Sequence, residues 1–477
     1  MPYTQVQFIA YQIDTSPANV KWNVNDVMVQ GTYPGLASNQ LDVQARCELM
    51  LRAMQTARDN LLPSSPPEAP GTTLKVLLAP EFFFRGSQGA YPMEDVQLAI
   101  EILQRTVSDD QWSDWVFGFG SILGVSAPAV GSPPTIDPNA VKEVYNFTLI
   151  QKGGVASQGH TGARVVMKEL KSGIDFIAQN ANPGGLLIGD VEHTVAGAKG
   201  PGNEQQRVNY DGAGIFDLDG ITWGVEICLD HLGSVKRLQK SPQLPGENQV
   251  QIQLVPSGGM SIQDASIIAA PGGYVFNCDG MNGGRSRLDQ VGTPPTIPPL
   301  STHPVDNAPI TLNEVSPVQD VAVTQLFKGN AGRIVTYPVK ALPPASKVQG
   351  SIVTLDWALG ADYRIKFDLV YDENGDYKTL LCQPSSTKTS FSLYNYFLPL
   401  VLTTYSKEML AVKALNDKRS PPAPTDPDVK IKIDVTGAAN GFDHGVLCHI
   451  DLPDFDFQGV AFLFNDTVAK PAPKTSW

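Results

Sequence analysis

The stretch "LLAPEFFFRG", residues 77–86, places a carboxylate at the end of one of the most apolar segments of the chain. The run 72–80 has the uninterrupted hydrophobicity of a strand that is buried on both faces. Burying an unpaired carboxylate costs on the order of several kcal/mol, so Glu81 requires either a partner or a chemical task. Another part of the sequence must supply the group that meets Glu81 in the fold.

Strands and helices alternate over most of the chain. Apolar residues at helical spacing predict helices over 41–62, which has an Asp at its start, and over 95–107. Residues 214–230 indicate a hairpin that turns at Asp219-Gly220. Strands are predicted over 6–14, 72–80, 115–123, 144–154, 163–171, 250–259 and 272–280. This order indicates an α/β layered fold whose sheet is covered by helices.

The pattern changes near residue 345. Beyond it, short segments alternate between apolar and polar residues, as half-buried strands do, and turn residues separate them. The Pro-rich stretches 341–347 and 420–428 indicate linkers. We therefore predict two domains, an α/β domain over residues 1–345 and a smaller β-rich domain of unknown role over residues 346–477.

Composition limits the classes of partner and compartment. The formal net charge of −13 argues against a nucleic-acid partner, because phosphate binding depends on Lys and Arg. The five cysteines are odd in number and widely scattered, which is typical of a reducing cytoplasm rather than of a disulfide framework. The start of the chain lacks the pattern of a secretory leader, and no apolar run is long enough to span a membrane. We expect a cytoplasmic protein without a membrane partner.

Reactive side chains follow three of the predicted strands. Glu81 ends the first, Lys168 or Lys171 the second, and Cys228 the third. Side chains at the carboxyl ends of strands in an α/β fold converge in the crevice outside those ends. A buried cysteine alone is usually inert packing. Beside a carboxylate and a lysine, however, it has a general base and a positive charge that stabilises its thiolate.

These three segments resemble the signature segments of the nitrilase (carbon–nitrogen hydrolase) superfamily. "LLAPEFFF", the lysine-bearing strand end and "GVEICLDH" (224–231) stand in the family's order, Glu, Lys, Cys. Further support comes from "YNFTLIQKGG" (145–154), "LVPSGG" (254–259) and "GGYVFNCDG" (272–280). The resemblance covers roughly residues 5–340. It implies an αββα four-layer sandwich, no cofactor, and a homodimer formed through the sandwich faces.

The resemblance also implies a role for each residue. Cys228 would attack a carbonyl or nitrile carbon and form a thioester or thioimidate, with Glu81 as the general base. The lysine and the backbone N–H of Leu229 would stabilise the oxyanion. We expect hydrolysis of a non-peptide C–N bond in a small molecule, an amide rather than a nitrile. Acyl transfer or amide synthesis through the same thioester stays open, as does a catalytically idle scaffold that acts as an interaction or effector protein.

The lysine segment departs from the family pattern. Val166 stands where the family has an aromatic residue two positions before the lysine. Lys168 continues the strand register best, so we prefer it and keep Lys171 as the alternative. The family's auxiliary glutamate has no clear match, and Asp175 is the candidate for its place.

Candidates for substrate contact are Phe82, Asp175 and His231. Phe82 belongs to a run of three phenylalanines that is expected to form core and pocket wall. His231 could pair with Cys228 in a Cys–His hydrolase, but three residues along a tight turn rarely give in-line geometry. The long stretches 85–94, 172–208 and 280–320 predict a covered site with a dedicated substrate.

The predicted C-terminal domain contains "DHGVLCH" (443–449), which offers His444, Cys448 and His449. These residues lack the spacing of a structural zinc site, so we predict no metal. A nitrilase domain followed by a β-rich domain resembles the layout of the vanin and biotinidase branch. The second domain would either complete the pocket or mediate assembly.

Overall fold

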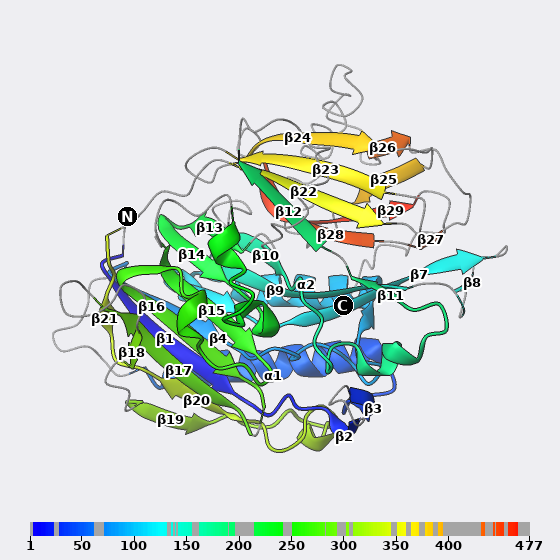
Figure 1. Ribbon diagram of the computed structural model, residues 1–477. Coiled ribbons are helices and arrows are strands. Elements are labelled where there is room, and N and C mark those ends of the chain that lie inside the picture. The colour runs from blue at the N-terminus through cyan, green and yellow to red at the C-terminus, as the bar shows by residue number, and fades with distance from the viewer. Residues whose placement is uncertain are drawn as a thin grey trace.

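The computed structural model shows a mixed α/β protein whose strands form several sheets (Figure 1). From residue 351 onward it describes the backbone alone. The described residues are 3–22, 28–61, 71–130, 135–136, 139, 142–154, 162–188, 190–195, 214–241, 250–281, 283–292, 302–304, 309–344, 351–358, 364–371, 377–384, 390–394, 431–434, 442–443, 445–452 and 457–465.

The first large sheet is built around β1, β4 and β6, which run parallel to one another. Along its main path the strands are β19 (Thr311–Glu314), β20 (Arg333–Thr336), β1 (Gln5–Gln12), β4 (Thr73–Leu78), β6 (Trp115–Gly118), β9 (Lys142–Lys152), β7 (Ile122–Val130) and β27 (Phe442–Asp443). Beside this path lie β5 (Tyr91–Pro92), β8 (Thr135–Ile136), β10 (Ala163–Met167), β11 (Leu186–Ile188) and β21 (Lys340–Ala341). A separate hairpin pairs β2 (Ala18–Trp22) with β3 (Met28–Thr32).

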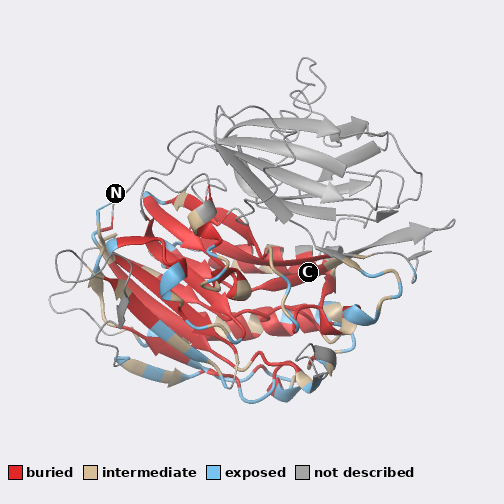
Figure 2. Cartoon of the chain, viewed as in Figure 1, coloured by how far each residue is buried: buried red, intermediate tan, exposed pale blue. Residues whose placement is uncertain are grey.

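The second sheet follows the chain order. Its strands are β13 (Ile215–Leu218), β14 (Ile221–Val225), β15 (Val250–Ser257), β16 (Ala269–Asp279), β17 (Arg285–Val291) and β18 (Thr302–Pro304). Apolar side chains of both sheets, including Phe8, Val76, Trp223 and Phe276, form one buried cluster between them. The two sheets therefore pack face to face, and Figure 2 shows their strands buried over most of their length.

Two α-helices cover the other face of the first sheet. They are α1 (Asn39–Asp59) and α2 (Met93–Val107), which agree with the helices predicted over 41–62 and 95–107. Their apolar residues share a core cluster with the first sheet. In the described residues, the outer face of the second sheet is covered by the 3₁₀ turns η5 (Cys228–His231), η6 (Leu238–Lys240) and η7 (Asp264–Ser266). Other 3₁₀ turns are η1 (Asp110–Trp112), η3 (Ile177–Ala181) and η8 (Val323–Gln325).

The strand predicted over 115–123 is wrong in one respect, because the chain forms two strands there. β6 ends at Gly118 and β7 begins at Ile122. Between them Gly120 has a φ of +76°, and a Cβ at this residue would overlap the carbonyl oxygen of Pro80. The break allows the Ser121 hydroxyl to accept a 2.9 Å hydrogen bond from the backbone N–H of Phe82. It therefore fixes the backbone directly after Glu81.

The strand predicted over 163–171, which carries the two candidate lysines, ends earlier than expected. β10 stops at Met167 rather than continuing to residue 171. The hairpin at Asp219-Gly220 is confirmed. Both residues have positive φ, 58° and 72°, as a two-residue hairpin turn with this twist requires. Cys228 follows the second arm of that hairpin, and η5 begins at it.

Beyond residue 345 the predicted alternating segments are strands. One sheet contains β12 (Asp190–Val195), β22 (Ser351–Ala358), β23 (Arg364–Tyr371) and β24 (Tyr377–Pro384), and another contains β25 (Ser390–Tyr394), β26 (Ile431–Asp434), β28 (Gly445–Leu452) and β29 (Phe457–Asn465). Because β12 pairs with β22, backbone pairing crosses the predicted boundary at 345. The division into two domains stays a prediction. Residue 444, named above as a possible metal ligand, lies outside the described residues.

No helix in the described part of the chain has both the length and the apolar character needed to cross a membrane.

Candidate active site

Glu81 lies just beyond the end of β4, and its side chain is completely buried. Its Oε1 accepts hydrogen bonds from Lys168 Nζ at 2.8 Å and from Asn146 Nδ2 at 2.9 Å. Within the described residues, its Oε2 accepts no hydrogen bond from any nitrogen or oxygen donor. The partner that the sequence required for Glu81 is thus a lysine and an amide, and one carboxylate oxygen is left open.

Lys168, the first residue after β10, is the lysine that reaches Glu81. Its Nζ also donates to both carboxylate oxygens of Asp175, at 2.9 and 2.7 Å. Its backbone N–H donates to the Asn146 carbonyl oxygen at 2.7 Å, which fixes where the side chain starts. Lys171 is exposed, and its Nζ donates to Asn180. Of the two predicted lysines, the structure brings Lys168 to the carboxylate and places Lys171 elsewhere.

Cys228 stands where the chain leaves β14 and enters η5. Its backbone has a φ of +50°, a left-handed conformation that non-glycine residues seldom adopt and that is concentrated at functional sites. The thiol lies beside the Glu81 carboxylate and lowers the pKa of Glu81. The backbone N–H of Gly258 points at the sulfur and lowers the pKa of Cys228. The three residues predicted from the strand ends therefore meet at one place.

Gly258 must be a glycine for this arrangement to exist. A Cβ at this residue would lie 2.6 Å from the Phe82 ring and 3.1 Å from Glu81 Oε2. Both neighbours are fully buried and cannot move aside without disturbing the carboxylate. The small residue lets its backbone N–H approach the thiol.

The charges of the site set its protonation. Burial raises the pKa of Glu81 to about 7, although Lys168 opposes the shift. Burial and the Glu81 carboxylate also raise the pKa of the Cys228 thiol, against the opposing effect of Lys168. Burial disfavours the Lys168 ammonium, yet Asp175 and Glu81 together raise its pKa well above the usual value. The resting site thus contains a charged lysine, a neutral thiol and a carboxyl group that exchanges its proton near neutral pH.

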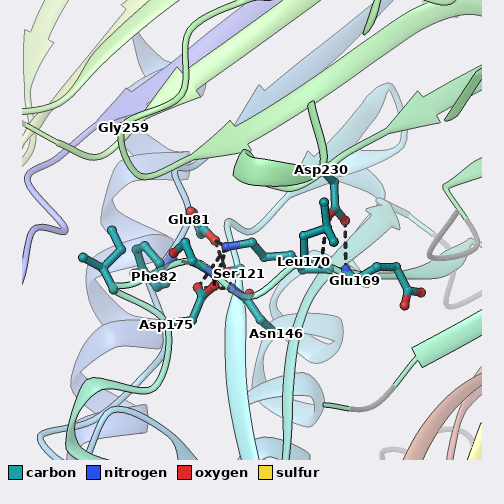
Figure 3. A network of polar contacts seen from close by, with 12 residues as sticks. Glu81, Phe82, Ser121, Asn146, Glu169, Leu170, Asp175, Asp230 and Gly259 are labelled. Atoms are coloured by element: carbon teal, nitrogen blue, oxygen red, sulfur yellow. Dashed lines mark hydrogen bonds and ion pairs between the residues drawn. The ribbon is translucent and has the colours of Figure 1, made fainter. Parts of the chain in front are cut away.

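Asp175 contacts the lysine and is shielded from solvent. Its side chain is completely buried, and besides Lys168 it accepts hydrogen bonds from Asn146 Nδ2 at 3.2 Å and from the backbone N–H of Ser172. Figure 3 shows Glu81, Asn146 and Asp175 directed toward one another. In this position Asp175 holds the lysine, and its expected contact with substrate stays a prediction.

A phenylalanine with positive φ follows each of the two acids. Phe82 has a φ of +64° and Phe176 a φ of +56°, and both belong to one buried apolar cluster. Such a backbone costs about 1–3 kcal/mol for each residue and persists only where the surroundings hold it. The Phe82 ring centroid lies 5.7 Å from Lys168 Nζ. The two aromatic side chains form an apolar wall beside the lysine.

His231 is fixed by the protein through both ring nitrogens. Its Nδ1 lies 2.7 Å from Glu226 Oε2, and its Nε2 accepts a 3.0 Å hydrogen bond from the backbone N–H of Gln263. Both ring nitrogens are thus engaged by the fold, and the expected substrate contact of His231 stays a prediction. Glu226 also accepts hydrogen bonds from Gln253 and from the backbone of Leu238. This buried network holds the turn that carries the cysteine.

Sequence reasoning missed Asp230, which connects two of the motif segments. Its carboxylate accepts hydrogen bonds from the backbone N–H groups of Glu169 and Leu170, each at 2.9 Å (Figure 3). Burial raises the pKa of Asp230 to about 6, although Arg237 opposes the shift. Asp230 thereby ties the cysteine turn to the two residues that follow Lys168.

Asn146 was missed as well, although it lies in the quoted segment "YNFTLIQKGG". A buried amide at an inward position of β9 was the available signal. Leu229 occupies the first turn of η5, where backbone N–H groups have no partner within the turn itself. The described residues contain no group of three His, Cys, Asp or Glu side chains with the arrangement of a metal site.

Comparison with known proteins gives matches at the level of structure alone. No protein-family model matches the chain, and no curated protein matches it. An amidase from Nesterenkonia sp. matches with 13% identity and a TM-score of 0.31, over 72% of this chain and 92% of that one. A mutant of the Nesterenkonia AN1 amidase from the nitrilase superfamily matches with 12% identity and a TM-score of 0.30, over 70% and 91%.

A carbon–nitrogen hydrolase from Helicobacter pylori G27 matches with 12% identity and a TM-score of 0.29, over 61% of this chain and 83% of that one. With TM-scores this low, the matches carry no information on the activity of this chain, which must be inferred from its own site. Among solved structures, the chain is similar to amidases and carbon–nitrogen hydrolases of the nitrilase superfamily, the family that its three motif segments resemble.

Proposed function

We propose that this chain is a cysteine-dependent hydrolase of a non-peptide C–N bond, with an amide rather than a nitrile as substrate. The observation that carries the proposal is the buried meeting of Glu81, Lys168 and Cys228, in which the carboxylate keeps one oxygen open beside the thiol. We further propose the αββα sandwich of the resembling family, with the 3₁₀ turns η5, η6 and η7 as the described part of its fourth layer.

The first step forms a bond between sulfur and carbon. Cys228 Sγ attacks the amide carbonyl carbon while its proton passes to Glu81, whose pKa of about 7 suits a base that works near neutral pH. The carbonyl π electrons move onto oxygen. The Lys168 ammonium and the Leu229 N–H stabilise that oxyanion, and because their positions are fixed beforehand no reorganisation is needed.

The second step breaks the C–N bond. Glu81 returns its proton to the nitrogen, the amine leaves, and a thioester remains on Cys228. A water molecule then loses a proton to Glu81 and attacks the thioester carbon. The C–S bond breaks, the carboxylic acid is released, and the sulfur regains a proton. Asp175 keeps Lys168 charged and directed at the reaction centre throughout.

The test needs no knowledge of the substrate. Iodoacetamide labelling of all five cysteines is followed by peptide mass spectrometry at pH 7 in wild type and in Glu81→Gln. We expect Cys228 to label faster than the buried Cys47 and Cys278, and to lose that advantage in the variant, because the base is gone. An ammonia-release screen over simple amides follows, with Cys228→Ser as the inactive control.

Equal labelling of Cys228, Cys47 and Cys278 would count against the proposal, as would an unchanged rate in Glu81→Gln. A smaller electrophile distinguishes a closed pocket from an unreactive thiol. If Cys228 fails to react with the smaller electrophile as well, the result would favour the catalytically idle scaffold. A thioester that forms but is released only by an added amine would favour the acyl-transfer alternative.

A further inference from the structure

Arg85 is a completely buried cation that the proposed mechanism does not use. It follows Glu81 by four residues, and its guanidinium donates to the backbone carbonyl oxygens of Thr15 and Ser16, the latter at 3.4 Å. Among the described residues, its Nε has no hydrogen-bond partner. None of the ion pairs formed between described side chains includes Arg85. Within the described part of the chain, the guanidinium is therefore buried without a carboxylate.

Arg85 lies one aromatic layer away from the proposed reaction centre. Its Cζ is 3.9 Å from the ring centroid of Tyr33. The Tyr33 hydroxyl donates to the carbonyl oxygen of Ile174, the residue before Asp175. The rings of Tyr33 and Phe82 have centroids 6.3 Å apart, and Phe82 in turn lies beside Lys168. The rings of Phe82 and Tyr33 thus separate the reaction centre from a positive charge for which the described residues supply no carboxylate.

The cost of this burial calls for a counter-ion. Burial lowers the pKa of Arg85 to about 9, so the guanidinium is still charged at neutral pH. Its two backbone acceptors satisfy only part of the five N–H donors of an arginine. A guanidinium presents a planar fork that matches a carboxylate, and such a pair gains most where water is excluded.

We propose that Arg85 binds a carboxylate of the substrate, so that the natural substrate is an amide bearing a carboxylate several bonds from the scissile bond. This inference rests on the proposed function. Tyr33, Phe82 and Phe176 belong to one buried apolar cluster, and the apolar part of such a substrate would pack against it. The site would select an anionic small molecule over neutral amides of the same size, because a neutral ligand leaves the guanidinium unpaired.

The experiment measures alkylation of Cys228 by matched pairs of reagents. Bromoacetyl-glycine is compared with the neutral bromoacetyl-glycinamide, and the comparison is repeated with β-alanine and γ-aminobutyrate in place of glycine. Rates are measured in the full chain at pH 7 by peptide mass spectrometry. We expect the acid to react about tenfold faster than its neutral partner at one of the three lengths, the gain that one charge-assisted pair supplies. Cys278 serves as the internal reference.

Variants then assign the preference to Arg85. Arg85→Met should abolish it while the rates of the neutral reagents stay within about twofold, and Arg85→Lys should keep part of it, because charge remains without the planar fork. The control Arg58→Met removes a positive charge at the end of α1 and should change nothing. Thermal melting shows that each variant is folded.

The outcomes separate the two proposals. If Cys228 reacts faster than Cys278 with the neutral reagents but prefers no acid at any length, the carboxylate site is overturned and the hydrolase proposal stands. A preference for the acids that persists in Arg85→Met also overturns the carboxylate site, because Lys168 would then be the source of that preference. If Cys228 is no more reactive than Cys278 toward any reagent, the proposed function fails and the inference fails with it.

Discussion

Two buried ion clusters contact the segment that contains Phe82 and Phe83. On the helix side, Arg46 Nε donates to Asp42 Oδ1 at 2.6 Å, and both side chains are completely buried. The remaining guanidinium nitrogens donate to backbone carbonyl oxygens, including that of Phe83 at 2.8 Å. The Asp42 carboxylate also accepts from the Tyr91 hydroxyl and from a backbone N–H. This cluster has one charge of each sign and its donors are occupied.

The second cluster is as deeply buried but is not balanced. Glu81 and Asp175 supply two carboxylates to the single ammonium of Lys168, and no nitrogen or oxygen of the described residues donates to Glu81 Oε2. A thiol lies beside this surplus charge. The difference teaches that burial of charge alone does not mark a reactive site. The features that mark a reactive site are an unequal number of positive and negative charges and an open acceptor next to a nucleophile.

The largest effect is expected from Arg46→Met, which leaves Asp42 buried without a cation. Breaking a buried pair by removing one partner destabilises by about 3–5 kcal/mol. Urea denaturation should show this loss in the free energy of unfolding. The alkylation rate of Cys228 in the folded variant should equal that of wild type. A loss below about 1 kcal/mol would show that the ion pair of Asp42 and Arg46 contributes little to the stability of the fold.

Lys168→Met should have the second largest effect, and it should act on reactivity. Without the ammonium, the pKa of Glu81 rises further and the thiolate of Cys228 loses its nearest positive charge. A shift of two pKa units corresponds to a rate loss of about 100-fold in iodoacetamide labelling at pH 7. Stability should fall less than in Arg46→Met, because Glu81 can take up a proton.

Lys171→Met is the matched control for the lysine. Its side chain is exposed and bonded to Asn180, so labelling of Cys228 should be unchanged. A larger loss in Lys171→Met than in Lys168→Met would reverse the assignment of the lysine.

Glu81→Gln tests the imbalance through pH. Burial raises the pKa of Glu81 from 4.5 to about 7, so the folded chain holds this proton more tightly than the unfolded chain. Its contribution to stability is then complete below about pH 4.5 and is lost as the pH rises through about 7. The free energy of unfolding of wild type, relative to the variant, should fall by up to about 3 kcal/mol over this range.

Urea denaturation at several pH values measures that difference. Over the same range, alkylation of Cys228 in wild type should accelerate as Glu81 becomes able to accept the thiol proton. A difference in stability that is flat with pH would mean that Glu81 titrates as an ordinary carboxyl group.

Local patterns were enough for the parts of the fold that depend on neighbouring residues. The hairpin at Asp219-Gly220 follows from its turn residues, and α1 and α2 follow from periodicity. Glu81 could be singled out because a carboxylate after a buried strand is costly. The identity of the lysine depended on strand register, which favoured Lys168, and the structure brings that residue to Glu81.

Contacts between distant segments could not be predicted in this way. The chain breaks at Gly120 because Pro80 approaches it, and no local pattern contains that approach. Asn146 resembles any inward polar residue of a strand until the register of β9 places it between two acids. His231 resembled a free histidine because Glu226 and the Gln263 N–H reach it only in the folded turn. Pairing of β12 with β22 likewise joins residues far apart in the sequence.

The smallest of these effects is expected from Asp230→Asn, which tests how the two halves of the site are held together. Asp230 accepts two backbone hydrogen bonds, from Glu169 and Leu170, and so fixes the chain directly after Lys168. An asparagine has one oxygen for these two donors, and its amide group would face the other N–H. We expect a loss of about 1–2 kcal/mol in stability and a drop of about fivefold to tenfold in Cys228 alkylation.

Labelling is measured far below the unfolding temperature, with the surface variant Asp59→Asn as the control. If stability falls while the labelling rate and its pH midpoint stay those of wild type, Asp230 only supports the fold; a shifted midpoint would show that it positions Lys168 toward Glu81.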